Sequence, residues 1–461
     1  MTLITSVSGI RGTLGGRPGS NLTAEDAARF TAAFAWWLQQ QQVPRLVVIG
    51  RDARPSGTWL AQVVCATLQS MGLDVIDLGL STTPTVQLMT AVHQAGGGIV
   101  ITASHNPAQW NALKLLNHHG ELLTEQQGQH MLELLQQGQL QYAPAEQQGQ
   151  VRGDDSGFDI HIEKILNLPL VQRNAIRKKR FRIVVDAVNS SGGVVIPRLL
   201  RALGVDQVIE LNCEPTGRFA HPPEPLEENL TALAQEVRLQ KASIGLAVDP
   251  DVDRLAFVSE DGSMFGEEYT LVAVADYVLQ HQPGPTVSNL SSTRALRDIT
   301  HKHGCVHHYA PVGEAHVVAR MKEVGAVIGG EGNGGIIYPA LHYGRDALVG
   351  IALFLSHLAT SGKTPSVLRS TYPNYVISKN KIQLTPDSDL NRLLEGIRRK
   401  YSAQPTNTED GLRIEFDGDW VHLRRSNTEP IIRIYAESRS ATTAANLAAK
   451  MIEDLRQLMK E

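Results

Sequence analysis

The chain has 461 residues, of which 42% are hydrophobic and 20% are charged, and its formal net charge is −4 at pH 7. This composition is ordinary for a globular protein, and the length favours roughly three or four domains. The chain has no long basic tract and no apolar run of bilayer length, so we expect neither nucleic acid nor a membrane as partner. Its three cysteines lie far apart, and its first residues do not resemble a signal peptide, so we expect a cytoplasmic location. The oligomeric state is left open.

Strand-like and helix-like segments alternate through the first three quarters of the chain. Helices are expected at residues 57–72 and around 194–203. The expected strands lie within residues 45–50, 74–79, 97–104, 180–193, 206–212, 286–293 and 325–332. This alternation argues for mainly parallel sheets with helices on both faces, in three similar units. The Gln-rich stretch 125–150 is expected to form a surface helix and a linker.

The last ninety residues follow a different pattern. Residues 411–438 alternate apolar and polar side chains with a period of two, as hairpin strands do, and 417–419 supply a turn. A closing helix is expected at about 442–459. We therefore predict an α/β protein of three similar mixed-sheet α/β domains and a smaller C-terminal α+β domain. The predicted domains are 1–150, 151–258, 259–369 and 370–461.

The apolar run 98–101 leads directly into Thr-Ala-Ser-His-Asn-Pro at 102–107. Asn and Pro end strands, so a simple turn is one interpretation. The other is that Ser104 is held at the carboxyl end of a sheet strand, where open α/β folds place their chemistry.

The stretch 249–254, Asp-Pro-Asp-Val-Asp-Arg, follows another apolar strand. Asp249, Asp251 and Asp253 repel one another unless a cation gathers them, and oxygen ligands suit Mg²⁺ or Ca²⁺. An EF-hand loop would need Gly where Arg254 stands, and helices where these flanks predict strands. A solvated acidic turn is the remaining alternative. A cation such as Arg254 beside a metal is suited to holding a phosphate.

Two further loops offer polar groups to a ligand. Glu331 and Asn333 stand among five glycines at 329–335, which indicates either a ligand loop or a flexible turn, without dinucleotide or P-loop spacing. Residues 424–430, Arg-Arg-Ser-Asn-Thr-Glu-Pro, join two expected strands. Arg424, Ser426, Asn427 and Thr428 form either a phosphate cradle or a capped turn. The histidine cluster at 301–308 matches no zinc spacing, and strand alternation explains it as well.

Together these four stretches, with Ser-Gly-Ile-Arg-Gly at 8–12, resemble the α-D-phosphohexomutases, whose signature loops occur in the same order. The resemblance implies four domains around a central cleft, with Ser104 as a phosphoserine. It implies that Mg²⁺ binds the serine phosphate and the three aspartates. It also assigns catalytic and substrate-binding roles, the catalytic residues being Ser104, His105, Lys114, Arg254 and Arg11, and the substrate-binding residues Glu331, Asn333, Arg424, Ser426, Asn427, Thr428 and Arg433.

The resemblance also implies an activity. Such an enzyme interconverts hexose 6-phosphate and hexose 1-phosphate through hexose 1,6-bisphosphate. The motifs look most like those of the archaeal phosphoglucosamine mutases, which favours glucosamine phosphates, with a glucose or mannose phosphomutase as the alternative. Many family members have Ser and His where this loop has Asn333 and Gly335, and small residues where it has Pro250 and Val252. Lys114 or a neighbouring His is the expected base.

Two functions other than phosphohexomutase activity are alternatives. A sugar-phosphate sensor without turnover would keep the cleft, but retention of Ser104 and all three aspartates argues against it. A Ser-His hydrolase would need a G-x-S-x-G elbow, which the chain lacks.

Overall fold

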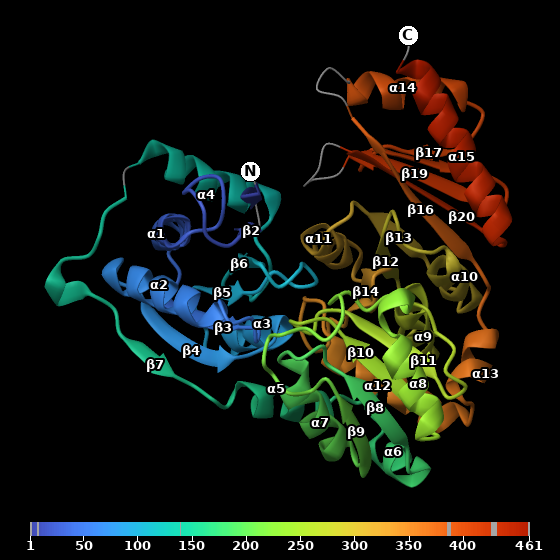
Figure 1. Cartoon of the computed structure of the whole chain (residues 1–461), viewed down its shortest axis with the longest axis horizontal. Helices are drawn as coiled ribbons and strands as arrows, with labels where there is room; N and C mark the ends of the chain where they lie inside the picture. The colour runs from blue at the N-terminus through green and yellow to red at the C-terminus, as the bar shows by residue number, and fades with distance from the viewer. Residues whose placement is uncertain (1, 7–8, 139, 385–388, 426–430, 460–461) are drawn as a thin grey trace.

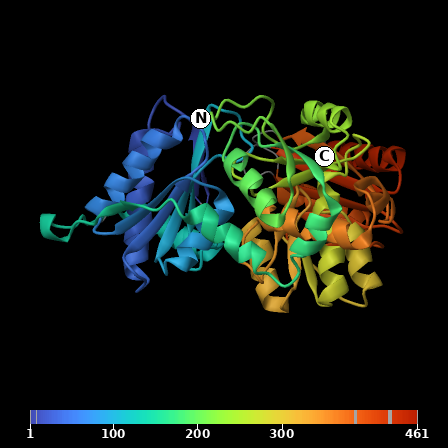
Figure 2. The same cartoon turned by 90° about the horizontal axis from the view of Figure 1, so that it is seen from below.

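The computed structural model describes residues 2–6, 9–138, 140–384, 389–425 and 431–459. These residues form four units, each built on one sheet and called domains I to IV here in chain order. Domain I lies to one side, domains II and III pack against each other, and domain IV stands on domain III (Figure 1). Figure 2, from below, shows the same separation of domain I from the other three. The predicted fold class is confirmed.

Domain I has a seven-stranded sheet in the order β1-β2-β6-β5-β3-β4-β7. Its strands are β1 (Ile4–Ser6), β2 (Gly9–Thr13), β3 (Leu46–Arg51), β4 (Asp74–Leu80), β5 (Gly97–Ile101), β6 (Trp110–Leu116) and β7 (Val151–Gly153), and its helices α1 (Ala24–Gln40), α2 (Gly57–Ser70), α3 (Thr83–Val92) and α4 (Glu125–Gln137). Strands β5, β3, β4 and β7 run parallel, whereas β6 returns antiparallel beside β5. Because β7 pairs with β4, the first sheet extends just past residue 150.

Domains II and III have four-stranded mixed sheets in the orders β11-β10-β8-β9 and β13-β12-β14-β15. Domain II comprises α5 (Gly157–Leu166), α6 (Arg173–Lys179), β8 (Arg182–Asp186), α7 (Gly192–Leu203), β9 (Gln207–Leu211), α8 (Thr231–Leu239), β10 (Ile244–Val248) and β11 (Leu255–Ser259). Domain III comprises α9 (Glu267–His281), β12 (Thr286–Asn289), α10 (Ala295–Lys302), β13 (His307–Ala310), α11 (Glu314–Val324), β14 (Ile328–Glu331), β15 (Gly335–Ile337), α12 (Ala347–Ser361) and α13 (Pro365–Ser370).

Domain IV is an antiparallel sheet in the order β16-β20-β19-β18-β17, covered by two helices. Its elements are β16 (Val376–Gln383), α14 (Leu390–Lys400), β17 (Thr406–Asn407), β18 (Leu412–Glu415), β19 (Trp420–Arg425), β20 (Ile431–Ser438) and α15 (Ala441–Leu458). The turn predicted at 417–419 joins β18 to β19, and α15 matches the predicted closing helix. This smaller α+β domain is therefore as the sequence predicts.

One apolar core runs through both domain II and domain III. It includes the stacked rings of Phe257 and Phe354, which come from β11 and α12, and Phe265 meets both rings edge-on. Domain I has its own main core, as does domain IV. Domains II and III therefore form one rigid base, because neither can expose this shared core to water without a large free-energy cost. Among the described helices, none is both long and apolar enough to cross a membrane.

Candidate active site

Each of the four polar motifs lies where one strand of a sheet turns back into an antiparallel partner. Residues 102–109 join β5 to β6, residues 249–254 join β10 to β11, and residues 332–334 join β14 to β15. Residues 426–430, between β19 and β20, include Ser426, Asn427 and Thr428, which lie outside the described residues. A loop that joins two antiparallel strands at their ends can present several polar groups to one point, and the first three loops do so.

Ser104 is held in an unusual backbone conformation and aimed at the metal loop. Its φ of +48° lies in the left-handed region, and its N–H donates to the Thr102 hydroxyl. Its Oγ donates to Asp249 Oδ2 at 2.6 Å, and His105 Nδ1 lies 3.4 Å from the same Oγ. Burial, followed by the charges of Asp251 and Asp253, raises the pKa of Asp249 well above its usual value. The hydroxyl of a buried serine is thus fixed against a buried carboxyl group.

Arg54 holds the serine loop from behind. Its side chain is fully buried and ion-paired with Asp52 at 3.1 Å. Its two Nη atoms donate to four carbonyl groups of the loop, those of Ser104, Asn106, Pro107 and Trp110. Asp52 in turn accepts a hydrogen bond from Thr102. A planar guanidinium with five donors can fix the whole loop at once. These hydrogen bonds offset the free-energy cost of the left-handed backbone conformation at Ser104.

The three aspartates curl around a common point, as the short reach of a metal's ligands requires. Asp249 Oδ1 accepts from the backbone N–H of Asp253 and of Arg254, and Val252 has a φ of +63°. One oxygen from each carboxylate lies within 4.8 Å of the others. Because β10 and β11 flank this loop as strands, an EF-hand is excluded.

Two cations compensate for this buried negative charge. Lys114 Nζ lies 2.6 Å from Asp251 Oδ2 and 3.0 Å from Asp253 Oδ2, and Arg345 Nη2 lies 2.7 Å from the latter oxygen. Burial alone would raise the pKa of Asp253, but Arg345 and Lys114 outweigh it and lower the pKa below its usual value. Burial would likewise lower the pKa of Lys114, yet Asp251 and Asp253 raise it. The lysine therefore carries its proton in this arrangement.

The donor set fits a hard divalent cation. All three carboxylates are fully buried, and Oδ1 of Asp251 and Oδ1 of Asp253 have no hydrogen-bond partner among the described residues. Unpartnered buried carboxylate oxygens are costly, and a cation bound among them would remove that cost. Carboxylate oxygens are the ligands that Mg²⁺ and Ca²⁺ prefer. The buried triad could therefore hold such a cation.

Arg345 connects the metal loop to the glycine-rich loop. Besides Asp253, it contacts Glu331 Oε2 at 2.9 Å and Glu314 Oε2 at 3.0 Å. A Cβ at Gly335 would stand 2.4 Å from Arg345 Cδ, so the glycine leaves room for this side chain. Gly335 therefore makes space for a buried arginine that three carboxylates share.

Glu331 is already oriented towards the pocket by its neighbours. Its Oε1 accepts hydrogen bonds from Asn289 Nδ2 at 2.8 Å and from the N–H of Gly313 at 3.0 Å, and its Oε2 pairs with Arg345. Asn333 lines the same pocket, and its Oδ1 accepts from the N–H of Gly335. A carboxylate fixed in this way can accept hydrogen bonds from a ligand's donor groups without first having to be ordered.

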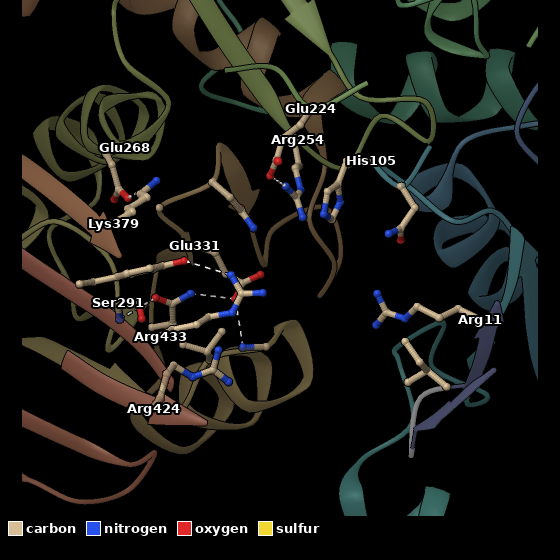
Figure 3. A pocket seen from close by; sticks show the side chains of 18 of the residues that line it. Arg11, His105, Glu224, Arg254, Glu268, Ser291, Glu331, Lys379, Arg424 and Arg433 are labelled. Carbon is tan, nitrogen blue, oxygen red and sulfur yellow. Dashed lines mark hydrogen bonds and ion pairs between the residues drawn. The ribbon is translucent and has the colours of Figure 1, made fainter. Parts of the chain in front are cut away.

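A pocket of about 740 Å³ lies between all four domains. Arg11 lines it from domain I, opposite Arg424 and Arg433 of domain IV, while Arg254 and His105 lie between them (Figure 3). A second cavity of about 310 Å³ shares Arg254, His105 and Glu331 with it and reaches Ser104 and Lys114. The serine is therefore reached from the inner end of the larger pocket.

The cations on the pocket wall influence one another. Burial and Arg254 lower the pKa of His105 to about 2, so its ring is neutral at pH 7. Burial and Arg254 also lower the pKa of Arg11. Arg254 Nη1 pairs with Glu224 Oε1 at 2.6 Å. Arg11 and Arg254, two cations on the wall of one cavity, favour the binding of an anion there.

At the far side, two arginines face each other across a strand pair. Arg424 on β19 is the cross-strand partner of Arg433 on β20, and Arg424 Nε pairs with Asp410 Oδ2 at 3.0 Å. Like charges directly opposite each other in a sheet repel, and a phosphate between them would remove that repulsion. Both side chains point into the pocket (Figure 3).

Four family models match the chain in order. They are described as the α/β/α domains I, II and III and the C-terminal domain of phosphoglucomutase/phosphomannomutase, and they match residues 3–141, 159–262, 266–375 and 385–454. The chain belongs to the phosphoglucomutase/phosphomannomutase family. It is therefore a phosphohexomutase, an isomerase that transfers a phosphoryl group within its substrate.

Individual relatives cover nearly the whole chain. The "Phosphoglucomutase/phosphomannomutase" of Thermococcus kodakarensis is 37% identical, over 96% of this chain and 98% of its own. The "Probable phosphoglucosamine mutase" of Methanopyrus kandleri is 34% identical, over 98% of each chain. A crystal structure of a family protein from Burkholderia thailandensis superposes with a TM-score of 0.84 and 28% identity, over 99% of this chain and 97% of the other.

The structure of this phosphohexomutase brings together the described residues that the sequence singled out. Ser104, His105, Lys114, Arg11, Arg254 and Glu331 line the two connected cavities, and Asn333, Arg424 and Arg433 line the larger one. Their individual roles stay predictions. In the histidine cluster, His307 is buried on β13 and hydrogen-bonded to Thr286 and Ser288, and no group of three metal ligands includes it among the described residues.

Sequence reasoning missed several groups of the site. Arg54 lies three residues past the strand end at Arg51, a position comparable to that of Ser104, and this was the available signal. Arg345 and Glu224 lie in loops without a recognisable motif. Glu268 and Lys379 line the pocket from domains III and IV, and burial raises the pKa of Glu268 to about 8. Only the three-dimensional arrangement identifies these groups.

Proposed function

We propose that this phosphohexomutase interconverts glucosamine 6-phosphate and glucosamine 1-phosphate, with Ser104 as the phosphoryl carrier. The observation that carries the serine's role is its 2.6 Å hydrogen bond to the aspartate triad, at the inner end of a pocket lined by all four domains. The glucosamine preference is supported by the motif pattern and by the name of the Methanopyrus relative, which matches over 98% of each chain.

A glucose or mannose phosphomutase is the second candidate. The Thermococcus relative, named for those two activities, is 37% identical to this chain. Both candidates use the same phosphoryl chemistry, and their sugars differ only in the group at the second carbon or in its configuration. In either case hexose 1,6-bisphosphate is the expected intermediate.

The chain's own residues supply most of what phosphoryl transfer requires, namely positioning and charge neutralisation. Ser104 is fixed by Arg54 and the left-handed turn, so its oxygen has one direction in which to act. Asp249, Asp251 and Asp253 would hold Mg²⁺, which supplies electrostatic stabilisation of the phosphoryl oxygens when bound. Lys114 and Arg254 flank the transfer and balance the charge of the phosphoserine, about −1.5 to −2.

The remaining residues of the pocket would bind the sugar and its second phosphate. Glu331 and Asn333 accept or donate hydrogen bonds to the hydroxyls, and Arg424 and Arg433 with Ser426, Asn427 and Thr428 grip the phosphate that is not reacting. The attacking hydroxyl must lose a proton, and of the two bases expected from the sequence, Lys114 or a neighbouring His, we propose His105 as the acceptor. His105 is neutral at pH 7, whereas Lys114 is held charged by two aspartates. The bisphosphate then turns so that its other phosphate faces Ser104.

Turnover of the 6-phosphates of glucosamine, glucose and mannose, measured side by side with excess Mg²⁺, tests the proposal. We expect the highest kcat/KM with glucosamine 6-phosphate. A higher value with glucose or mannose 6-phosphate would assign the enzyme to the second candidate. Binding of all three without turnover would instead indicate a sugar-phosphate sensor. The three cysteines are free thiols, which fits the cytoplasmic location that we also propose.

A further inference from the structure

A second buried group of metal-ligand side chains lies outside the pocket. It consists of His161 on α5, His342 in the loop before α12, and Asp346, the N-cap residue of α12. His161 and Asp346 are fully buried, and His342 is partly buried. None of the three lines either of the connected cavities. The mechanism above therefore makes no use of them.

The three side chains converge on one point. His161 Nε2 lies 2.9 Å from Asp346 Oδ2, and His342 Nε2 lies 3.2 Å from the same oxygen. The three ligand atoms all lie within 4.8 Å of one another. Two ligands bound at about 2.0–2.2 Å from a tetrahedral zinc ion are separated by roughly 3.3 Å, so small adjustments of the side chains would suffice.

The neighbours of these ligands hold them in position as the outer groups of a metal site do. His161 Nδ1 is hydrogen-bonded to Thr85 Oγ1 at 2.9 Å, which leaves Nε2 as the atom facing Asp346. The other oxygen of Asp346 accepts from the N–H groups of Leu348 and Val349 at the start of α12. Hydrogen bonds to the second nitrogen of a histidine and to the second oxygen of a carboxylate are typical of metal ligands.

We propose that His161, His342 and Asp346 form a site for a divalent transition-metal ion of the zinc type, separate from the aspartate triad. Two imidazoles and one carboxylate suit Zn²⁺ or Co²⁺, whereas Mg²⁺ prefers oxygen ligands alone. The two clusters therefore differ in ligand chemistry and would select different ions. Three protein ligands leave one position open, on the side where His342 is partly exposed.

The position of this site suggests what a bound ion would do. Thr85 belongs to α3 of domain I, His161 to domain II, and Asp346 to domain III, and α3 lies beside α5 (Figure 1). The residue after Asp346, Ala347, donates its N–H to the carbonyl of Val252 in the metal loop. An ion bound here would fasten the junction of three domains directly behind the triad, as a structural metal does.

The alternative is that Asp346 Oδ2 merely accepts a hydrogen bond from each imidazole. Metal analysis of the full-length protein separates the two. Protein stripped with a chelator is dialysed against Zn²⁺ in a large excess of Mg²⁺, which keeps the triad filled, and bound zinc is counted. We expect one equivalent in the wild type, at least tenfold weaker binding in His342→Ala, and wild-type binding in the control His118→Ala, whose histidine is exposed.

Absence of zinc from the wild type would overturn the proposal, as would equal binding by His342→Ala. If His342→Ala does not fold, the zinc X-ray absorption spectrum of the wild type decides the question. We expect two imidazoles and one carboxylate in its first coordination shell, and a shell of oxygens alone would contradict the site. A Zn²⁺-dependent rise in Tm of the wild type, absent from Asp346→Asn, is the supporting result.

Discussion

The two ends of the pocket are built differently. At the serine end, Ser104, the aspartate triad, Lys114 and Arg345 form one buried network that draws on domains I, II and III. At the opposite end, Arg424 and Arg433 lie on one hairpin of domain IV, and Arg424 forms an ion pair with Asp410. The first end fixes geometry and neutralises charge, whereas the second offers cations to a ligand. We infer that chemistry occurs at the first end, and that the second holds whichever phosphate is not reacting.

Removal of the carrier should have the largest effect. Ser104→Ala deletes the proposed phosphoryl carrier, so kcat should fall by about a thousandfold or more. Binding of a hexose monophosphate should persist, because the arginine hairpin is untouched. Steady-state turnover and calorimetric binding check both expectations, with Ser263→Ala in an exposed turn as the matched control. A fully active Ser104→Ala enzyme would contradict the assignment of the two ends.

Loss of one triad carboxylate should come next. Asp251→Asn removes one of three charges that would hold the cation, so the apparent Mg²⁺ affinity and kcat should both fall by roughly 10²-fold. Ca²⁺ should bind but support turnover poorly, because its geometry is looser. A Mg²⁺ titration of activity measures this, and Asp261→Asn, in an exposed turn, is the control. Undiminished activity in excess chelator would rule out a metal at the serine end.

Removal of an arginine from the other end should cost less. Arg424→Ala deletes a charge-assisted contact worth roughly 1.5–3 kcal/mol, which corresponds to about a ten- to hundredfold loss of binding. The loss should be similar for the 1-phosphate and the 6-phosphate, since both use the same hairpin in opposite orientations. Calorimetric binding of each monophosphate tests it. The matched control is Arg425→Ala, since Arg425 is the exposed neighbour of Arg424. Weakened binding of only one monophosphate would mean that the hairpin is not shared.

Acid should weaken the attachment of domain IV. His422 is buried, its Nε2–H donates to the carbonyl of Asp410, and its Nδ1 accepts from Ser291 of domain III. Burial lowers its pKa from 6.5 to about 4. Because the unfolded chain binds this proton more readily, stability is lost as the pH falls from about 6.5 to 4, by about 2 kcal/mol at pH 5.

Urea unfolding at pH 7 and pH 5 measures this effect. The decrease in unfolding free energy between the two pH values should be smaller in His422→Gln than in the wild type, since the variant has no imidazole to protonate. All other titratable groups are common to both proteins, so their contributions cancel in the comparison. An equal decrease in both proteins would show that His422 does not contribute to acid sensitivity.

The loops that contain Ser104 and the aspartate triad could be predicted from the sequence, because each is a short continuous stretch of the chain. Ser104 and the triad directly follow apolar strands, and their residue types suit a nucleophile and a hard cation even without the fold. Arg54 and Arg345 could not be assigned in the same way. Arg345 lies 92 residues from Asp253, and its contact with that residue exists only because domains II and III fold together.

The shared core of domains II and III was also beyond the reach of the sequence pattern. The βαβ alternation correctly predicts three similar units, since each has its own sheet. It cannot say that Phe257 of β11 stacks on Phe354 of α12, because periodicity describes one element at a time and not the element that covers it. The proposed metal site of His161, His342 and Asp346 depends on the same packing, and no sequence motif indicates it.

Ser104 as the carrier of the phosphoryl group can be tested on the enzyme itself. Incubation of the enzyme with glucose 1,6-bisphosphate labelled in its phosphates, followed by mass spectrometry of the peptide that contains residues 102–107, tests it directly. We expect label on Ser104 that is transferred back to a hexose monophosphate when unlabelled substrate is added. Label on another residue, or none on Ser104 in an enzyme that turns over, would contradict it.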